Sequence, residues 1–164
     1  MRHGRSTASR TSSLLPDPRE TRVMKKKVRR FEDLTAWQMA MDLAERVYEI
    51  SDRPPFARDF ALADQVHRAA ISVPSNIAEG FERGSRAEFH RFLTIAKASC
   101  AELRTQIMLA KRIRRAEPTD ADIALALAEQ TARTIGKLRA VVAKQRRTPL
   151  MPHSPCLMPE DQCS

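Results

Sequence analysis

The sequence predicts an all-α fold, an antiparallel up-down-up-down four-helix bundle, on three observations. The chain of 164 residues holds only four glycines and 5% aromatic residues. Its middle is dominated by Ala, Leu, Arg and Glu, whose side chains lose little rotamer freedom in a helix. Apolar residues recur at spacings of three and four along four long segments. Short connections join these segments, which favours antiparallel neighbours.

Charge and composition divide the chain into three parts. Residues 1–30 carry ten Lys and Arg against two acids and show no apolar periodicity, which predicts a disordered basic leader. Residues 31–147 are expected to form the bundle. Residues 148–164 contain four prolines, two acids and no Lys or Arg, which predicts a disordered tail. The formal charge of +9 therefore comes mainly from the leader. Translation could start at Met1 or at Met24.

The first helix is expected from about Leu34 to Ile50. Apolar residues recur at spacings of three and four, which predicts the core face, and they are Leu34, Trp37, Met41, Ala44 and Tyr48. The polar stripe of this helix is narrow, and a helix buried on one side only would not need so many other apolar residues. We therefore expect it to contact another subunit too. The candidate interface residues are Trp37, Met39, Leu43 and Ile50.

Proline, glycine and capping residues separate the other three helices. Pro54–Pro55 should break the chain before a second helix over about residues 59–83, and Pro74 inside that helix predicts a kink. A third helix is expected over about residues 85–115, starting with a capping box of Ser85 and Glu88. A fourth should run over about residues 119–145, with Thr119 as N-cap.

A row of polar residues at spacings of four, four, three and four marks the second helix. Its members are Arg68, Ser72, Asn76, Glu79 and Arg83. The row could be a binding site, but a structural polar network is favoured. In that network Ser72 and Asn76 would satisfy backbone groups freed by Pro74, and Arg68 or Arg83 would pair with Glu79.

The longest recognisable pattern spans residues 65–102. Its members are Arg68, Ser72, Pro74, Asn76-Ile77-Ala78-Glu79-Gly80, Arg83, Ser85, Phe92-Leu93, Ile95-Ala96 and Glu102. With an upstream Phe31-Glu32-Asp33-Leu34, Trp37 and Tyr48, it resembles the four-helix-bundle family of 23S rRNA intervening-sequence proteins over about residues 31–145. One departure is Ala98-Ser99, where the family usually has Gly-Ser, so the closest helix contact could differ.

The resemblance implies a four-helix protomer and a ring-shaped homopentamer, without an enzymatic activity or a ligand site. A related branch contains the accessory ring protein of diversity-generating retroelements. In that branch the ring is basic and contacts RNA and a reverse transcriptase.

Three basic clusters are candidates for binding RNA or DNA. They are Lys25, Lys26, Lys27, Arg29 and Arg30 in the leader, Arg112, Arg114 and Arg115 after the third helix, and Lys144, Arg146 and Arg147 after the fourth. The alternative is that the cations at the two helix ends only complement the helix dipoles. Antiparallel packing should place these two ends at opposite poles, and ring symmetry would repeat each cluster into a band.

Enzyme signatures are missing from the sequence. A di-metal bundle needs two Glu-x-x-His elements, and only Asp64-x-x-His67 comes near this pattern. His153, Cys156 and Cys163 fit no zinc-finger spacing, and Cys100 lies on a core face. We therefore expect no catalytic residue, metal or cofactor.

These observations predict a cytoplasmic, non-enzymatic homo-oligomer, with five subunits by the resemblance, that acts as an RNA-associated scaffold. No apolar run is long enough to span a membrane, and the odd cysteine count favours reduced thiols. The first alternative is a structural or protein-interaction module without nucleic-acid binding. A remote alternative is a di-metal enzyme. The physiological partner is left open.

Overall fold

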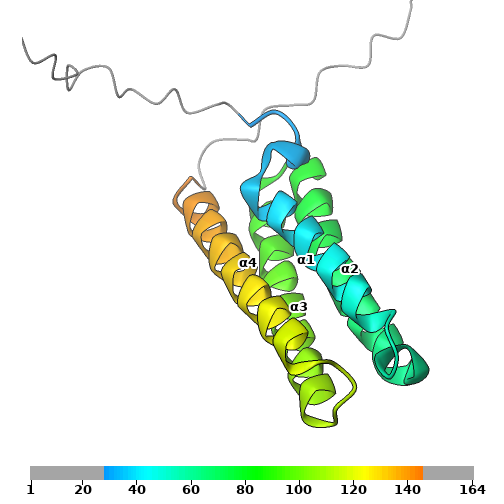
Figure 1. Cartoon of the computed structure of the whole chain (residues 1–164). Helices are drawn as coiled ribbons and strands as arrows, with labels where there is room; N and C mark the ends of the chain where they lie inside the picture. Colours follow the sequence, from blue (N-terminus) through cyan, green and yellow to red (C-terminus); the bar gives the residue numbers. More distant parts are fainter. Residues whose placement is uncertain (1–27, 146–164) are drawn as a thin grey trace, which may run out of the picture.

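The protein is a four-helix bundle in the computed structural model, which describes residues 28–145 (Figure 1). The elements are the 3-10 turn η1 (Phe31–Asp33), α1 (Thr35–Ser51), the 3-10 turn η2 (Phe56–Arg58), α2 (Phe60–Glu82), α3 (Arg86–Arg112) and α4 (Pro118–Lys144). Each helix packs against the next, and α4 closes against α1. The all-α prediction is confirmed, with most helix ends one residue from their expected positions. Residues 1–27 of the predicted leader and the whole predicted tail, residues 148–164, lie outside the described residues, as do residues 146–147 of the predicted bundle.

The buried side chains form two clusters along the length of the bundle. One lies near the α1–α2 and α3–α4 turns, and Phe56 of η2 fills it. The other lies near η1 and the α2–α3 turn, around Ile77, Leu93 and Ile135. Between them Thr131 of α4 is fully buried, and its hydroxyl donates to the Leu127 carbonyl at 2.8 Å. The interior is thus divided into two apolar clusters along the bundle, with the buried Thr131 between them.

The predicted core face of α1 was only partly right. Leu34 and Ala44 are buried as predicted, whereas Trp37, Met41 and Tyr48 are only half buried. The other residues of α1 that enter the core are Ala36, Ala40, Leu43, Val47 and Ile50. Leu43 is 0% exposed and Ile50 is 3% exposed, so neither can belong to an oligomer interface as predicted. Met39 faces α4, where its sulfur accepts a hydrogen bond from Thr134 Oγ1 at 3.4 Å. Of the four predicted interface residues, Trp37 alone lines an open surface.

The closest approach of α2 and α3 depends on Gly80. A methyl group at this position would lie 2.5 Å from Phe92 Cβ and 3.2 Å from Phe89 Cδ2. Real Cβ atoms do not approach other atoms this closely, so only glycine permits the observed packing. Gly80 is the last residue of the Asn-Ile-Ala-Glu-Gly pattern, so the packing of α2 against α3 explains the glycine at this position.

The predicted caps were only partly right. Ser85 is the N-cap residue of α3, but its side chain makes no capping hydrogen bond. Helix α4 begins earlier than expected, with Glu117 as N-cap and Pro118 in the first turn, where proline needs no hydrogen-bond donor. Helix α2 continues through Pro74.

Candidate functional site

The polar row of α2 divides into a helix contact and separate surface ion pairs. Asn76 Nδ2 donates to the Ser72 carbonyl at 2.7 Å, and Ser72 Oγ lies 2.8 Å from Ser99 Oγ of α3. Ser99 in turn donates to the Ile95 carbonyl at 3.2 Å. This chain of hydrogen bonds ties α2 to α3 and leaves no group aimed at a ligand. The departure at Ala98-Ser99 keeps the serine that makes this contact.

The charged members of the row form the predicted network only in part. Arg68 pairs with Asp64 at 2.8 Å and not with Glu79. Arg83 pairs with Glu79 at 2.6 Å, as expected, and its guanidinium lies 4.8 Å from the centroid of the Phe92 ring. The side chains of Arg68, Arg83 and Glu79 are at least half exposed, so these are ordinary surface pairs. The buried-network interpretation holds only for Ser72 and Asn76.

One pole of the bundle gathers cations from both ends of the described chain. Figure 1 shows the segment before η1 and the end of α4 at the same pole. Arg29, Arg30 and Lys144 are exposed there. A hydrogen bond from Arg86 to Gln145 joins the start of α3 to the end of α4 at this pole. The remaining candidates of this group, over residues 25–27 and 146–147, lie outside the described residues.

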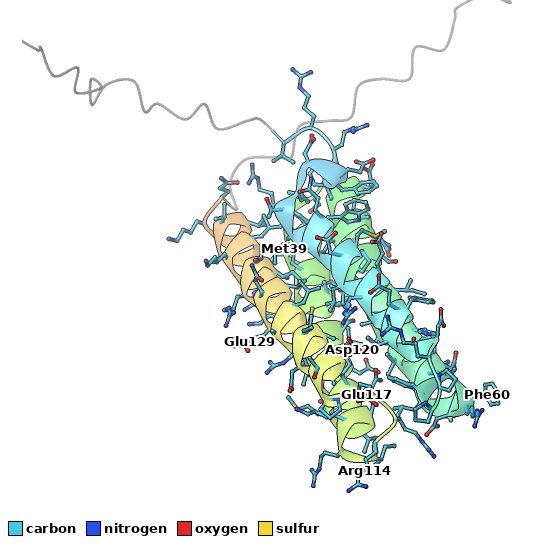
Figure 2. The ribbon with its side chains drawn as sticks, viewed as in Figure 1. Met39, Phe60, Arg114, Glu117, Asp120 and Glu129 are labelled. Carbon is cyan, nitrogen blue, oxygen red and sulfur yellow. The ribbon has the colours of Figure 1, made fainter. Side chains whose placement is uncertain are left out.

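The opposite pole carries the second cluster, at the end of α3. Arg114 sits at this pole (Figure 2) with a φ of 59°, and the next N–H, of Arg115, donates to the Ala110 carbonyl at 2.8 Å. Arg115 Nε also lies 3.1 Å from Asp59 Oδ2. Arg115 therefore has a structural role at the helix end. Arg112 and Arg114 are exposed and make no ion pair with other described residues.

An apolar groove runs along the outside of α1 and α2. It has a volume of about 530 Å³ and is lined by Phe31, Trp37, Met41, Ala44, Glu45, Tyr48, Ile71, Pro74, Ser75 and Ala78. The Phe31 and Trp37 rings meet edge to face at 5.3 Å. Tyr48 stacks on His67 at 4.1 Å. The groove was not predicted from the sequence, because its large α1 side chains were assigned to the core.

The groups considered for catalysis have structural partners. His67 Nε2 lies 2.6 Å from the oxygen of Ser51, which is buried, while Asp64 pairs with Arg68. Burial raises the pKa of the Cys100 thiol to about 12, which removes the thiolate needed for nucleophilic chemistry. Over residues 28–145 no group of three or more His, Cys, Asp or Glu side chains could hold a metal ion. No described helix is long and apolar enough to cross a membrane.

The fold defines the class of protein, which is a small four-helix bundle. Its Asn-Ile-Ala-Glu-Gly pattern supports the packing of α2 against α3. The family model of the 23S rRNA-intervening sequence protein matches residues 32–137. The chain belongs to this family. No curated protein matches it significantly.

Proposed function

We propose that the protein is a non-enzymatic homo-oligomer that serves as a scaffold for nucleic acid, with RNA as the preferred ligand. The observation that carries the proposal is the basic pole. There Arg29 and Arg30, where the leader joins the bundle, lie at the same end as Lys144. The family is named after an insertion in ribosomal RNA, which makes RNA the natural anion to test.

Binding at this pole would act on phosphates. Arg30 is 70% exposed in its side chain and lies 3.9 Å from Glu32, a weak pair that leaves its charge available. Affinity from such contacts comes from counterion release and falls steeply with salt. Base stacking has little support, because Phe89 and Phe92 are buried and the half-buried Phe31 and Trp37 rings pack edge to face against each other. We expect binding without sequence specificity.

Oligomerisation would multiply this weak charge. A single folded domain carries nineteen Lys and Arg against sixteen acids over residues 31–147, which is an ordinary balance. Several linked copies would present several basic poles to one RNA molecule, and the combined affinity would exceed that of one copy. The apolar groove supports assembly, because monomers seldom expose large apolar surfaces. The proposed number of five subunits rests on the resemblance.

The test is a titration of a structured RNA with the full chain at low and at moderate salt. Replacing the five leader cations at positions 25–27, 29 and 30 by glutamine should weaken binding several-fold or more. A matched comparison removes two charges at each pole: Arg29→Gln with Arg30→Gln should weaken binding more than Arg112→Gln with Arg114→Gln at the other pole. A full chain that binds no RNA even at low salt would contradict the nucleic-acid role.

A second candidate function is a protein-interaction module without nucleic-acid binding. The groove favours it, since an apolar surface with tyrosine and tryptophan is typical of protein contacts. An oligomer that ignores RNA but retains its groove contacts would support this alternative. Metal analysis of the purified protein tests the non-enzymatic part of the proposal, because stoichiometric bound metal would contradict it.

A further inference from the structure

Charge is distributed unequally between the two helix pairs. Helices α1 and α2 together carry six acidic side chains against two Arg, whereas α3 and α4 carry ten Lys and Arg against five acids. One side of the bundle is thus negative and the other positive. In a contact with twofold symmetry, both copies use the same surface, so like charges would face each other. In a head-to-tail contact, the negative surface of one copy would face the positive surface of the next.

The negative side contains the apolar groove and a rim of carboxylates. Glu45 lines the groove, and Asp42 lies one helical turn before it on the exposed side of α1. Neither carboxylate forms an ion pair with another described residue. On the α2 wall Ile71 is 48% exposed. This surface would accept an apolar partner that carries positive charge at its edges.

The outer face of α3 has these properties. Its exposed centre holds mainly small or apolar side chains, namely Ile95, Ala98, Ala101, Thr105 and Met108. One carboxylate, Glu102, lies on the same face, where it accepts a hydrogen bond from Gln106 Nε2 at 3.2 Å. Ile95 is 38% exposed and Met108 is 44% exposed. The Thr105 hydroxyl is already used, since it donates to the Ala101 carbonyl at 3.0 Å. Small side chains allow another helix pair to approach closely.

Basic side chains flank this face of α3. Arg91 precedes it, Arg112 follows it and Lys97 lies along its edge, all exposed. The lengths agree as well. At about 1.5 Å per residue, the groove wall from Trp37 to Tyr48 spans about 16 Å and the α3 face from Ile95 to Met108 spans about 20 Å.

We propose that the α1–α2 groove of one copy receives the outer face of α3 from a second copy, in a head-to-tail contact. This inference rests on the proposed homo-oligomer and specifies its interface. The contact buries the groove residues against the α3 centre and places Asp42 and Glu45 beside the α3 cations. The C-terminal segment 148–164 also contains apolar residues, but it carries two acids and no Lys or Arg, so the acidic rim would repel it.

The test uses one substitution on each surface, both at exposed positions. Ile71→Glu places a carboxylate in the groove, and Ala101→Glu places one in the centre of the α3 face, where burial of an unpaired charge is costly. Each variant alone should be monomeric by light scattering at tens of micromolar, with an unchanged helical circular-dichroism signal. The control Ala140→Glu, on the exposed side of α4, should keep the mass of the unsubstituted protein.

Mixing the two variants provides the decisive result. The intact α3 face of the Ile71→Glu chain should bind the intact groove of the Ala101→Glu chain, giving a dimer of twice 18.6 kDa and nothing larger. An Ala101→Glu variant that keeps the full oligomer would overturn the proposal and indicate a groove-to-groove contact. A mixture that stays monomeric would overturn it too. If the unsubstituted protein is itself monomeric, the proposed oligomer fails, and this inference fails with it.

A charge reversal covers the case in which either substitution unfolds the chain. Asp42→Lys with Glu45→Lys should raise the dissociation constant about tenfold or more, and so should Arg91→Glu with Lys97→Glu. The four changes combined in one chain should recover most of the loss. Absence of recovery would overturn the proposed pairing of the two surfaces.

Discussion

Gly80→Ala is the substitution for which the structure gives the clearest expectation. The new methyl carbon would lie 2.5 Å from Phe92 Cβ, where ordinary contacts begin at 3.4 Å. Helices α2 and α3 would have to separate locally by about 0.9 Å, the difference between these two distances. A rotamer change cannot relieve the contact, because Phe92 Cβ is fixed to the α3 backbone.

Two terms of opposite sign set the size of the effect. Overpacking of a well-packed core costs about 1–3 kcal/mol, whereas replacing a mid-helix glycine by alanine gains about 1 kcal/mol. The clash involves two buried phenylalanines, so the upper part of the overpacking range applies. We expect a net loss of about 1–2 kcal/mol in the free energy of unfolding.

Gly136→Ala is the matched control, because it makes the same change in another helix. The added methyl would meet no described atom closer than Lys97 Nζ, at 3.8 Å, an ordinary contact. The helix-propensity term should then act alone and stabilise the protein by about 0.5–1 kcal/mol.

Thermal unfolding at one fixed protein concentration, which matters for an oligomer, compares the two variants. For a domain of this size, about 3–5 °C corresponds to 1 kcal/mol. The two melting temperatures should therefore fall on opposite sides of the parent value. A Gly80→Ala protein as stable as Gly136→Ala would refute the packing argument.

Three further predictions concern the thiol, an ion pair and the chain ends. With the other cysteines replaced by serine, Cys100 should resist thiol reagents in the native state. Its pKa is raised to about 12, so the unfolded chain ionises first and stability should fall as pH rises above about 9, by up to about 1.4 kcal/mol per pH unit. Asp120→Ala should lower the free energy of unfolding, measured with urea, by about 1 kcal/mol, because the half-buried Arg46, 2.5 Å away, loses that partner. If the effects of Asp120→Ala and Arg46→Ala simply add in the double mutant, the two residues do not interact and the prediction is wrong. Residues 24–147 alone should melt within about 5 °C of the full chain, and a larger drop would mean that an end segment docks on the bundle.

The sequence predicted the number, order and limits of the helices well. The third helix shows why. Its apolar residues that recur at spacings of three and four from Phe89 to Ala110 are all buried, because a strong apolar period fixes which face turns inward. Pro118 and Gly84 mark the breaks on either side. These signals are local, so they can be found without knowledge of the packing.

The first helix shows where such prediction fails. Two apolar rows compete on α1, one with the large Trp37, Met41 and Tyr48, the other with the small Ala36 and Ala40. Size favoured the first row, but the helices pack closely enough that the small row lies inside. The groove could not be predicted for the same reason, since it is lined by the large row of α1 together with residues of α2.

The two proposed surfaces are compatible with one assembly. A head-to-tail contact that closes into a ring relates all copies by rotation about a single axis. Rotation leaves equivalent atoms at the same height along that axis, so Arg29, Arg30 and Lys144 of every copy form one band. Arg112 and Arg114 form another band. The groove contact uses the sides of α1, α2 and α3, and it reaches the first band only at Phe31, next to Arg30. If both proposals hold, abolishing assembly through Ala101→Glu should weaken RNA binding while every phosphate-binding side chain is still present. Equal RNA affinity of the monomeric variant and the oligomer would show that assembly adds nothing to binding.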